Sequence, residues 1–189
     1  MEPFEEDIVA ALDTLRKGGL ILYPTDTIWG IGCDATNPEA VAKVYQLKKR
    51  MDNKAMIVLV ADERDIFQYV AAPDMELFDY LEKCTKPTTV IYEGALGLAE
   101  NLTGKDGSVG IRICNDSFCR HLIKRFRKPI VSTSANFSGE IAPANFHQIH
   151  ESIRKGVDYI VQWRQEEKKE AVASSVIRWN QGQIEVIRP

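Results

Sequence analysis

The chain has 189 residues, of which 24 are Lys or Arg and 27 are Asp or Glu, so its formal net charge is −3. A chain of this length can form one domain, 1–189, with a core large enough to need neither disulfides nor a structural metal. No stretch approaches the roughly 20 apolar residues of a membrane-spanning helix, and the acidic N-terminus is unlike a signal peptide. We therefore expect a cytoplasmic protein with reduced cysteines and no membrane association.

Helices and strands alternate along most of the sequence. Apolar residues at helical spacing predict helices over 5–17, about 36–48, 62–71, 74–83, 116–126 and 145–155, the second starting at a Thr36/Glu39 capping box. Short apolar runs predict strands over 20–23, 55–60, 88–92, 108–113, 129–132 and 158–161, and a terminal hairpin over 175–187. This order predicts an α/β fold, a single domain with a mixed β-sheet flanked by helices.

The basic residues gather in two segments. Residues 43–54 carry five bases against Asp52 alone, and residues 120–128 carry five bases and no acid. In the first segment the bases continue past a helix into the loop before a strand, which suits a phosphate, although lysines also favour a helix C-terminus. In the second segment the bases and the apolar residues fall on opposite helical faces, which predicts that these bases decorate the exterior of a helix.

Three other segments place polar groups beside a buried strand. Residues 23–32 hold threonines and glycines at a strand end, where α/β proteins place ligands, although the threonines could equally cap local backbone. Residues 131–139 lead from a strand into consecutive Ser, Thr and Asn residues that can present donors to an anion. Ser108, Gly110 and Arg112 share one strand face, and Arg112 is either solvated or a charge clamp near a phosphate.

The familiar catalytic and nucleotide motifs are absent. The sequence contains no G-x-x-x-x-G-K-[ST] loop and no G-x-G-x-x-G fingerprint. If the protein binds ATP, it therefore uses a different kind of phosphate-binding site. It also contains no G-x-S-x-G elbow, which disfavours a serine hydrolase.

Taken together, these segments resemble the YrdC/Sua5 family in its short form, over nearly the whole chain. The motifs that carry the resemblance are 23–32, Lys48-x-Arg50 with Lys54, 108–112, Ser132 to Asn136 with Ser138-Gly139, Ser174 to Ile177, and Ile187-Arg188-Pro189. The resemblance implies a twisted sheet with an electropositive cleft. The chain departs from the family pattern at residues 85–89 and at Met51, Ala55, Leu59 and Ala142.

The resemblance also implies an activity, that of a nucleotidyltransferase. L-threonine and bicarbonate would react with ATP, accompanied by Mg²⁺, to give L-threonylcarbamoyl-adenylate and pyrophosphate. A tRNA threonylcarbamoyl transferase complex would then use this product to modify tRNA. Such a reaction needs positioned positive charge rather than a protein nucleophile.

Residue roles follow from the same resemblance. The residues that would hold the phosphates during catalysis are Lys48, Arg50 and Lys54. Those that would bind threonine are Thr25, Arg112, Ser132 and Ser174. Those that would bind the nucleotide are Arg50, Lys54, Ser108, Ser134, Asn136 and Arg188. No protein-bound metal is expected.

Two alternatives remain beside this enzyme. The two basic segments motivate an RNA-binding protein that uses the same cleft without catalysis, and its affinity would fall steeply with salt. A related carbamoyl-adenylate chemistry occurs in a similar domain of hydrogenase-maturation proteins. That reading is disfavoured because the zinc-finger and acylphosphatase parts of those proteins are missing here.

Overall fold

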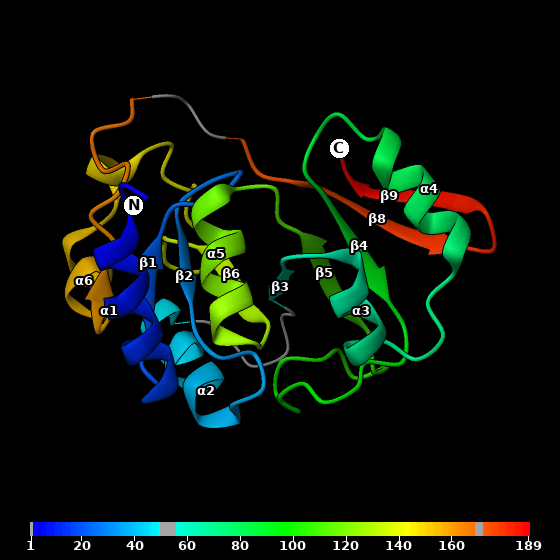
Figure 1. The fold of residues 1–189 in the computed structure, drawn as a ribbon, viewed down its shortest axis with the longest axis horizontal. Helices are drawn as coiled ribbons and strands as arrows, with labels where there is room; N and C mark the ends of the chain where they lie inside the picture. The colour runs from blue at the N-terminus through cyan, green and yellow to red at the C-terminus, as the bar shows by residue number, and fades with distance from the viewer. Residues whose placement is uncertain (1, 50–55, 169–171) are drawn as a thin grey trace.

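The computed structural model describes residues 2–49, 56–168 and 172–189, and its strands join into one sheet (Figure 1). The helices are α1 (Glu5–Arg16), α2 (Pro38–Lys48), α3 (Glu63–Tyr69), α4 (Met75–Lys83), α5 (Ser117–Phe126) and α6 (Glu151–Lys155), with a 3₁₀ turn at Phe146–Gln148. The strands are β1 (Ile21–Tyr23), β2 (Gly30–Gly32), β3 (Ile57–Val60), β4 (Thr88–Tyr92), β5 (Val109–Ile113), β6 (Ile130–Ser134), β7 (Tyr159–Ile160), β8 (Ser175–Asn180) and β9 (Gln183–Arg188). No helix of the described residues is long and apolar enough to cross a membrane.

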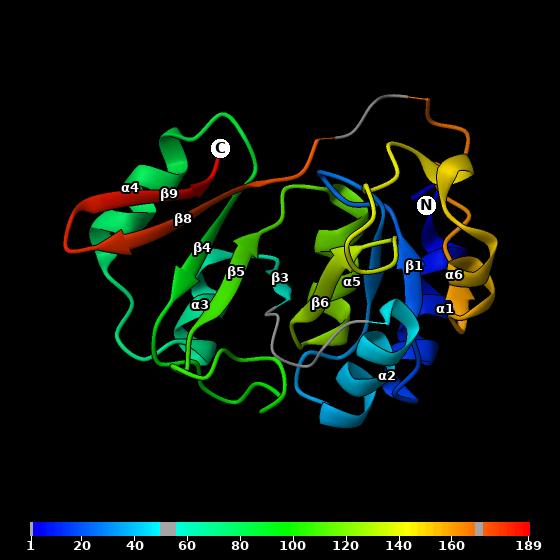
Figure 2. The ribbon, with the colours of Figure 1, turned by 180° about the vertical axis from the view of Figure 1, so that it is seen from behind.

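The sheet is mixed, as the alternation of elements predicts. Its strand order is β7-β1-β2-β6-β3-β5-β4-β8-β9. The pairs β1/β7, β3/β5 and β4/β8 are parallel, and the other neighbours are antiparallel. Helices α1, α2, α5 and α6 surround the half formed by β1, β2 and β6, whereas α3 and α4 accompany β4 and β5 (Figures 1 and 2). The expected α/β class is therefore confirmed.

Two apolar layers hold the sheet between them. Leu59 and Ile130 belong to a core that includes the apolar faces of α1 and α5. Val58 and Val131 belong to a second core that includes α2. Because successive strand residues point to opposite faces, Ile57 shares the face of Leu59. Helices α1 and α5 therefore cover this face near Leu59. Nearer Ile57, the same face lines a cavity.

Two local predictions are wrong. The N-cap of α2 is Asn37, whose side chain accepts from the backbone N–H groups of Glu39 and Ala40. Thr36 lies one residue before this N-cap, and its hydroxyl donates to Asp34 Oδ1. The helix expected over 145–155 is divided into the 3₁₀ turn and α6, because Ile149 is extended and the imidazole of His150 caps α6 at Ser152 N–H.

Strand β2 was missed, and its Gly32 has a packing role rather than a ligand-binding one. A Cβ on Gly32 would lie 2.6 Å from Cε1 of Tyr23 and 2.9 Å from the carbonyl oxygen of Val131. The Tyr23 hydroxyl donates to that same carbonyl, so the ring cannot swing aside without losing the bond. Gly32 thus lets the buried Tyr23 ring cross β2.

We expect Gly32→Ala to lower the free energy of unfolding by about 1–3 kcal/mol, because the added methyl group overpacks this crossing. Gly110→Ala is the matched control, since its Cβ would meet only Thr89 Cγ2 at 3.4 Å and Ile57 Cγ1 at 3.9 Å. Urea unfolding of both variants measures the difference. Equal stabilities for the two variants would contradict the role given to Gly32.

Candidate active site

A cavity of about 370 Å³ lies on the sheet face that Ile57 shares with Leu59. Its lining brings together six predicted site residues from four separate segments: Ser108, Arg112, Ser132, Ser134, Ser174 and Arg188. Ala142, one of the departures from the family pattern, also lines it, whereas Leu59 is buried in the core. The size is in the range of small-molecule sites.

The strand register explains how distant residues meet here. One row across the sheet runs from Ile57 through Gly110 and Ile91 to Arg178. A neighbouring row contains Thr89, Val176 and Arg188, and Arg112 on β5 is paired with Leu59 on β3. Because paired residues point to the same face, both rows present their side chains to the cavity.

Arg112 is buried on the cavity wall, so the solvated alternative is wrong. Its Nη2 donates to Asp26 Oδ1 at 2.9 Å and to Thr27 Oγ1 at 3.1 Å. Its Nε is buried and has no hydrogen-bond partner among the described residues. The ion pair with Asp26 therefore fixes the guanidinium, whose Nε remains a donor without a partner among the described residues.

Arg188 is held at the cavity by the chain segment that carries Ser174. Its Nε and Nη2 donate to the Ser174 carbonyl at 3.0 and 2.8 Å. The Ser174 hydroxyl in turn lies 2.8 Å from the Thr89 hydroxyl. Burial and, second, the positive charge of Arg112 lower the pKa of Arg188. Two cations that line one cavity favour the binding of an anion there.

Thr25 does not line this cavity, although its hydroxyl lies 3.0 Å from the Thr27 hydroxyl that Arg112 contacts. It lines an adjoining cavity of about 430 Å³, which shares Thr27, Ile28 and Ala173 with the first cavity. Its hydroxyl donates to the Ile28 carbonyl at 2.7 Å and accepts from the Thr27 N–H at 3.0 Å. Thr25 therefore stabilises the turn between the two cavities, which agrees with the alternative that these threonines cap local backbone.

Lys48 and Asn136 lie outside the lining of the cavity. Lys48 is buried, and its Nζ donates to the carbonyls of Ser134 and Asn136 and, at 3.3 Å, to Asn136 Oδ1. The Asn136 amide donates to the Glu140 carbonyl at 2.6 Å. The resemblance had implied that Lys48 holds the phosphates and that Asn136 binds the nucleotide, yet neither side chain lines the cavity. Both side chains instead fix the loop after β6, which carries Ser134 into the cavity.

Two of the predicted phosphate-binding residues, Arg50 and Lys54, lie outside the described residues, as do Met51 and Ala55. The chain is described again from Met56, which with Ile57 lines the cavity. These predictions therefore stand as made from the sequence.

The basic residues of 120–128 do not line this cavity, which confirms the expectation for them. Arg125 pairs with Glu5 at 2.6 Å, and Lys128 pairs with Asp34 at 2.6 Å. Phe118, Leu122 and other apolar residues of α5 face the core instead.

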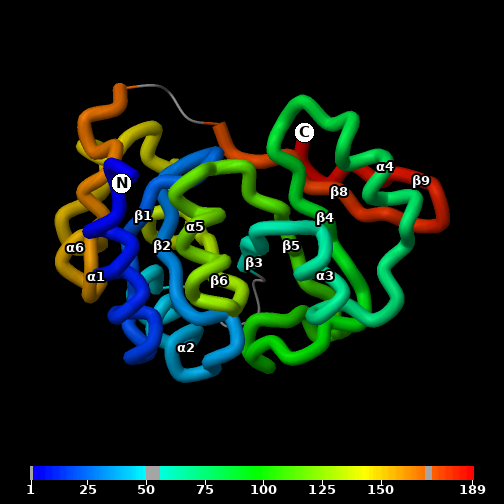
Figure 3. Tube along the Cα trace, in the orientation of Figure 1, coloured from blue at the N-terminus to red at the C-terminus, as the bar shows by residue number. Residues whose placement is uncertain are grey.

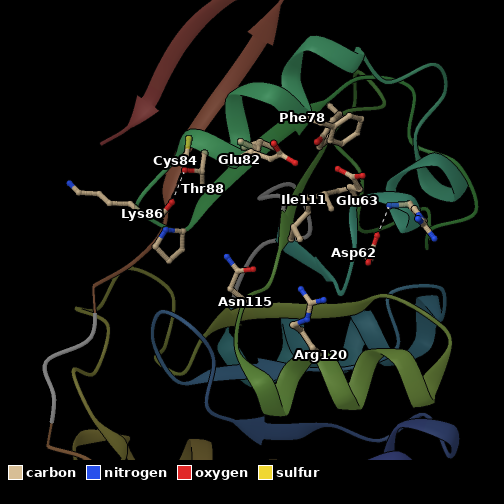
Figure 4. A pocket seen from close by; sticks show the side chains of 15 residues that line it. Asp62, Glu63, Phe78, Glu82, Cys84, Lys86, Thr88, Ile111, Asn115 and Arg120 are labelled. Carbon is tan, nitrogen blue, oxygen red and sulfur yellow. Dashed lines mark hydrogen bonds between the residues drawn. The ribbon is translucent and has the colours of Figure 1, made fainter.

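A second cavity, of about 500 Å³, lies on the other face of β4 and β5 (Figure 4). Figure 4 shows Arg120 and Asn115 on one side of it and Glu63 and Phe78 on the other. None of the predicted site residues lines it. The described lining mixes acids with bases, whereas the first cavity has only bases among its charged lining residues. We therefore take the first cavity as the candidate active site.

Two lining residues were missed from the sequence. Thr89 is buried and supports Ser174, and Arg178 projects into the cavity from β8. The alternation of Val176 and Arg178 in the expected hairpin could have placed both on one face. It could not show that this face meets a cavity rather than solvent.

Comparison with known proteins places this fold in one class, the α/β domain of Sua5-type proteins. The structure of Pyrococcus abyssi Sua5 complexed with L-threonine matches with a TM-score of 0.87 and 24% identity, over 98% of this chain and 54% of that one. E. coli YciO matches with a TM-score of 0.81 and 21% identity, over 99% and 90% of the two chains. This chain thus spans about half the length of that Sua5 chain.

The family model for Sua5, YciO and YrdC proteins, described as "Telomere recombination", matches residues 13–189, so the chain belongs to this family. A threonylcarbamoyl-AMP synthase of Blochmanniella floridana is 32% identical over 150 residues, 78% of each protein. A putative threonylcarbamoyl-AMP synthase of Methanocaldococcus jannaschii is 32% identical over 161 residues, 83% of this chain and 75% of that protein.

Proposed function

We propose that this chain is a threonylcarbamoyl-AMP synthase that joins L-threonine, bicarbonate and ATP. The observation that carries the proposal is that six predicted residues line one cavity. Among the described residues of that lining, the charged ones are all arginines. The names of the curated relatives and the threonine-bound Sua5 structure support it.

The reaction would proceed in two bond-forming steps. The threonine amine forms a C–N bond with the carbon of bicarbonate, and water leaves to give a carbamate. A carbamate oxygen then attacks the α-phosphorus of ATP, and the bond to pyrophosphate breaks. Neither step needs a protein nucleophile, so the protein contributes orientation and positive charge.

The cavity residues divide between the substrates in this proposal. Arg112 receives the threonine carboxylate through its Nε donor, and Ser132 and Ser174 contact the same substrate. Arg188, Ser108 and Ser134 contact the nucleotide, and Arg50 and Lys54 supply charge as pyrophosphate departs. The Ser174 hydroxyl and the Arg188 guanidinium lie 3.3 Å apart, which would bring the two substrates close together.

Mg²⁺ would enter with ATP as part of the substrate. Magnesium prefers oxygen ligands, chiefly carboxylates, phosphates and water. Since the described lining of the cavity has no Asp or Glu, phosphate and water oxygens suit it better than protein ligands here. The product would pass, in the cytoplasm, to a tRNA threonylcarbamoyl transferase complex.

The decisive assay measures pyrophosphate release from ATP with and without L-threonine and bicarbonate. We expect release only when both are present. Release that is absent, or that ignores threonine, would contradict the proposal. Retention of tRNA that weakens steeply with salt, without pyrophosphate release, would instead favour the RNA-binding alternative. One motive for that alternative is reduced, because the bases of 120–128 lie away from this cavity.

A further inference from the structure

The charged side chains of the candidate active site differ in how many hydrogen bonds and ion pairs they make with the rest of the protein. Among the described residues that line it, Arg112, Arg178 and Arg188 are charged. Arg112 is paired with Asp26 at 2.9 Å, and Arg188 donates twice to the Ser174 carbonyl. These two guanidinium groups are held in fixed orientations by short contacts.

Arg178 has no such contact. Its Nη1 lies 3.7 Å from Glu185 Oε2, which is beyond hydrogen-bond distance. The Glu185 side chain is 61% exposed, so water screens this pair. The Nε of Arg178 is buried and has no hydrogen-bond partner among the described residues. Arg178 is thus a cation at the cavity with donors still to be satisfied.

The position of Arg178 relates it to one part of a nucleotide. It lies in the same row across the sheet as Ile57, through Gly110 and Ile91. Ile57 opens β3 directly after the segment that contains the predicted phosphate-binding residues Arg50 and Lys54. Arg188 belongs to the neighbouring row, with Thr89 and Val176. Arg178 therefore lines the cavity in the same row as Ile57, three strands away from it.

We propose that Arg178 contacts the β- and γ-phosphates of a nucleoside triphosphate and makes the site prefer a triphosphate over a monophosphate. A guanidinium group can donate to two phosphate oxygens at once. Arg178 can leave the solvent-screened Glu185 more easily than Arg112 can leave the buried Asp26. This inference rests on the proposed function, because it takes ATP as the ligand.

The test measures dissociation constants for ATP with Mg²⁺, for AMP and for pyrophosphate by titration calorimetry. For Arg178→Ala we expect ATP affinity to fall roughly tenfold or more, the effect of one lost charge-assisted contact. AMP affinity should stay within about twofold of the wild-type value by the same reasoning, since no β- or γ-phosphate is present. Arg178→Lys should fall between, because lysine keeps the charge and loses the fork.

Two controls separate a phosphate contact from a structural role. Glu185→Gln removes the carboxylate that faces Arg178, so ATP should bind at least as tightly as to the wild type. Arg120→Ala removes an arginine of the other cavity and should leave both nucleotides unaffected. If Arg178 only braces β8 against β9, Arg178→Ala and Glu185→Gln should instead weaken ATP and AMP alike and lower Tm together, which would overturn the inference.

The outcomes distinguish this inference from the proposed function. A wild-type protein that binds ATP without threonine-dependent pyrophosphate release contradicts the proposed function, while an altered ATP-to-AMP ratio in Arg178→Ala still supports the role of Arg178. An active wild type with an unchanged ratio in Arg178→Ala overturns the role of Arg178 and leaves the proposed function intact. A wild-type protein that does not bind ATP overturns both.

Discussion

Replacing Arg112 with glutamine is expected to reduce kcat/KM for threonine by about 10²-fold or more, the usual scale for loss of a positioned charge contact. The substitution removes the donor that would receive the threonine carboxylate. It also leaves Asp26, whose side chain is 10% exposed, as a buried charge without its partner. Breaking a buried pair in this way costs about 3–5 kcal/mol, so stability should fall together with activity.

The double variant Asp26→Asn with Arg112→Gln separates these two effects. A neutral amide no longer needs a cation, so the free energy of unfolding should recover by about 2 kcal/mol or more. Turnover should not recover, because the threonine contact is still missing. Urea unfolding and the pyrophosphate assay at varied threonine concentrations provide the two readouts. Recovery of turnover in the double variant would assign Arg112 a purely structural role.

The second large effect is expected from Lys48→Met, which should lower the free energy of unfolding by about 3 kcal/mol or more. The methionine fills most of the volume but leaves the Ser134 and Asn136 carbonyls without the buried ammonium that they accept from. The loop after β6 should then shift, and KM for ATP should rise because Ser134 is displaced from the cavity.

Lys49→Ala is the matched control for this substitution. The Lys49 ammonium lies 4.9 Å from the centroid of the Phe137 ring, a contact worth only about 0.5–1 kcal/mol at an exposed site. Urea unfolding should therefore separate the two lysines clearly. If Lys48→Met loses turnover at unchanged stability, Lys48 contacts the phosphates directly, as the sequence indicated.

Most of the sheet was predictable because several of its strands are short apolar runs that are buried along most of their length. Strand β2 was not predictable, since two of its three residues are glycines. Only Ile31 has an apolar side chain that could indicate a strand. The break at His150 was also hidden, because the apolar residues on either side still follow helical spacing.

The site was predictable to the extent that its chemistry is local. Ser132 and Arg112 follow from the ends and faces of strands. The position of Lys48 could not be predicted, since a lysine in the last turn of a helix normally reaches solvent. Its partners Ser134 and Asn136 lie 86 and 88 residues away, and only the antiparallel pairing of β6 with β2 and β3 brings that loop beside α2.

The placement of β8 and β9 has a consequence for how the protein is made. Figure 3 traces the chain from α1 at one side of the molecule to these two strands at the other. Ser174, Arg178 and Arg188 reach the cavity only once β8 has paired with β4, a strand synthesised more than 80 residues earlier. A nascent chain can fold its helices and central strands on the ribosome. It gains the complete lining of this cavity only after β8 and β9 have been released, so ligand binding can report that these two strands have joined the sheet.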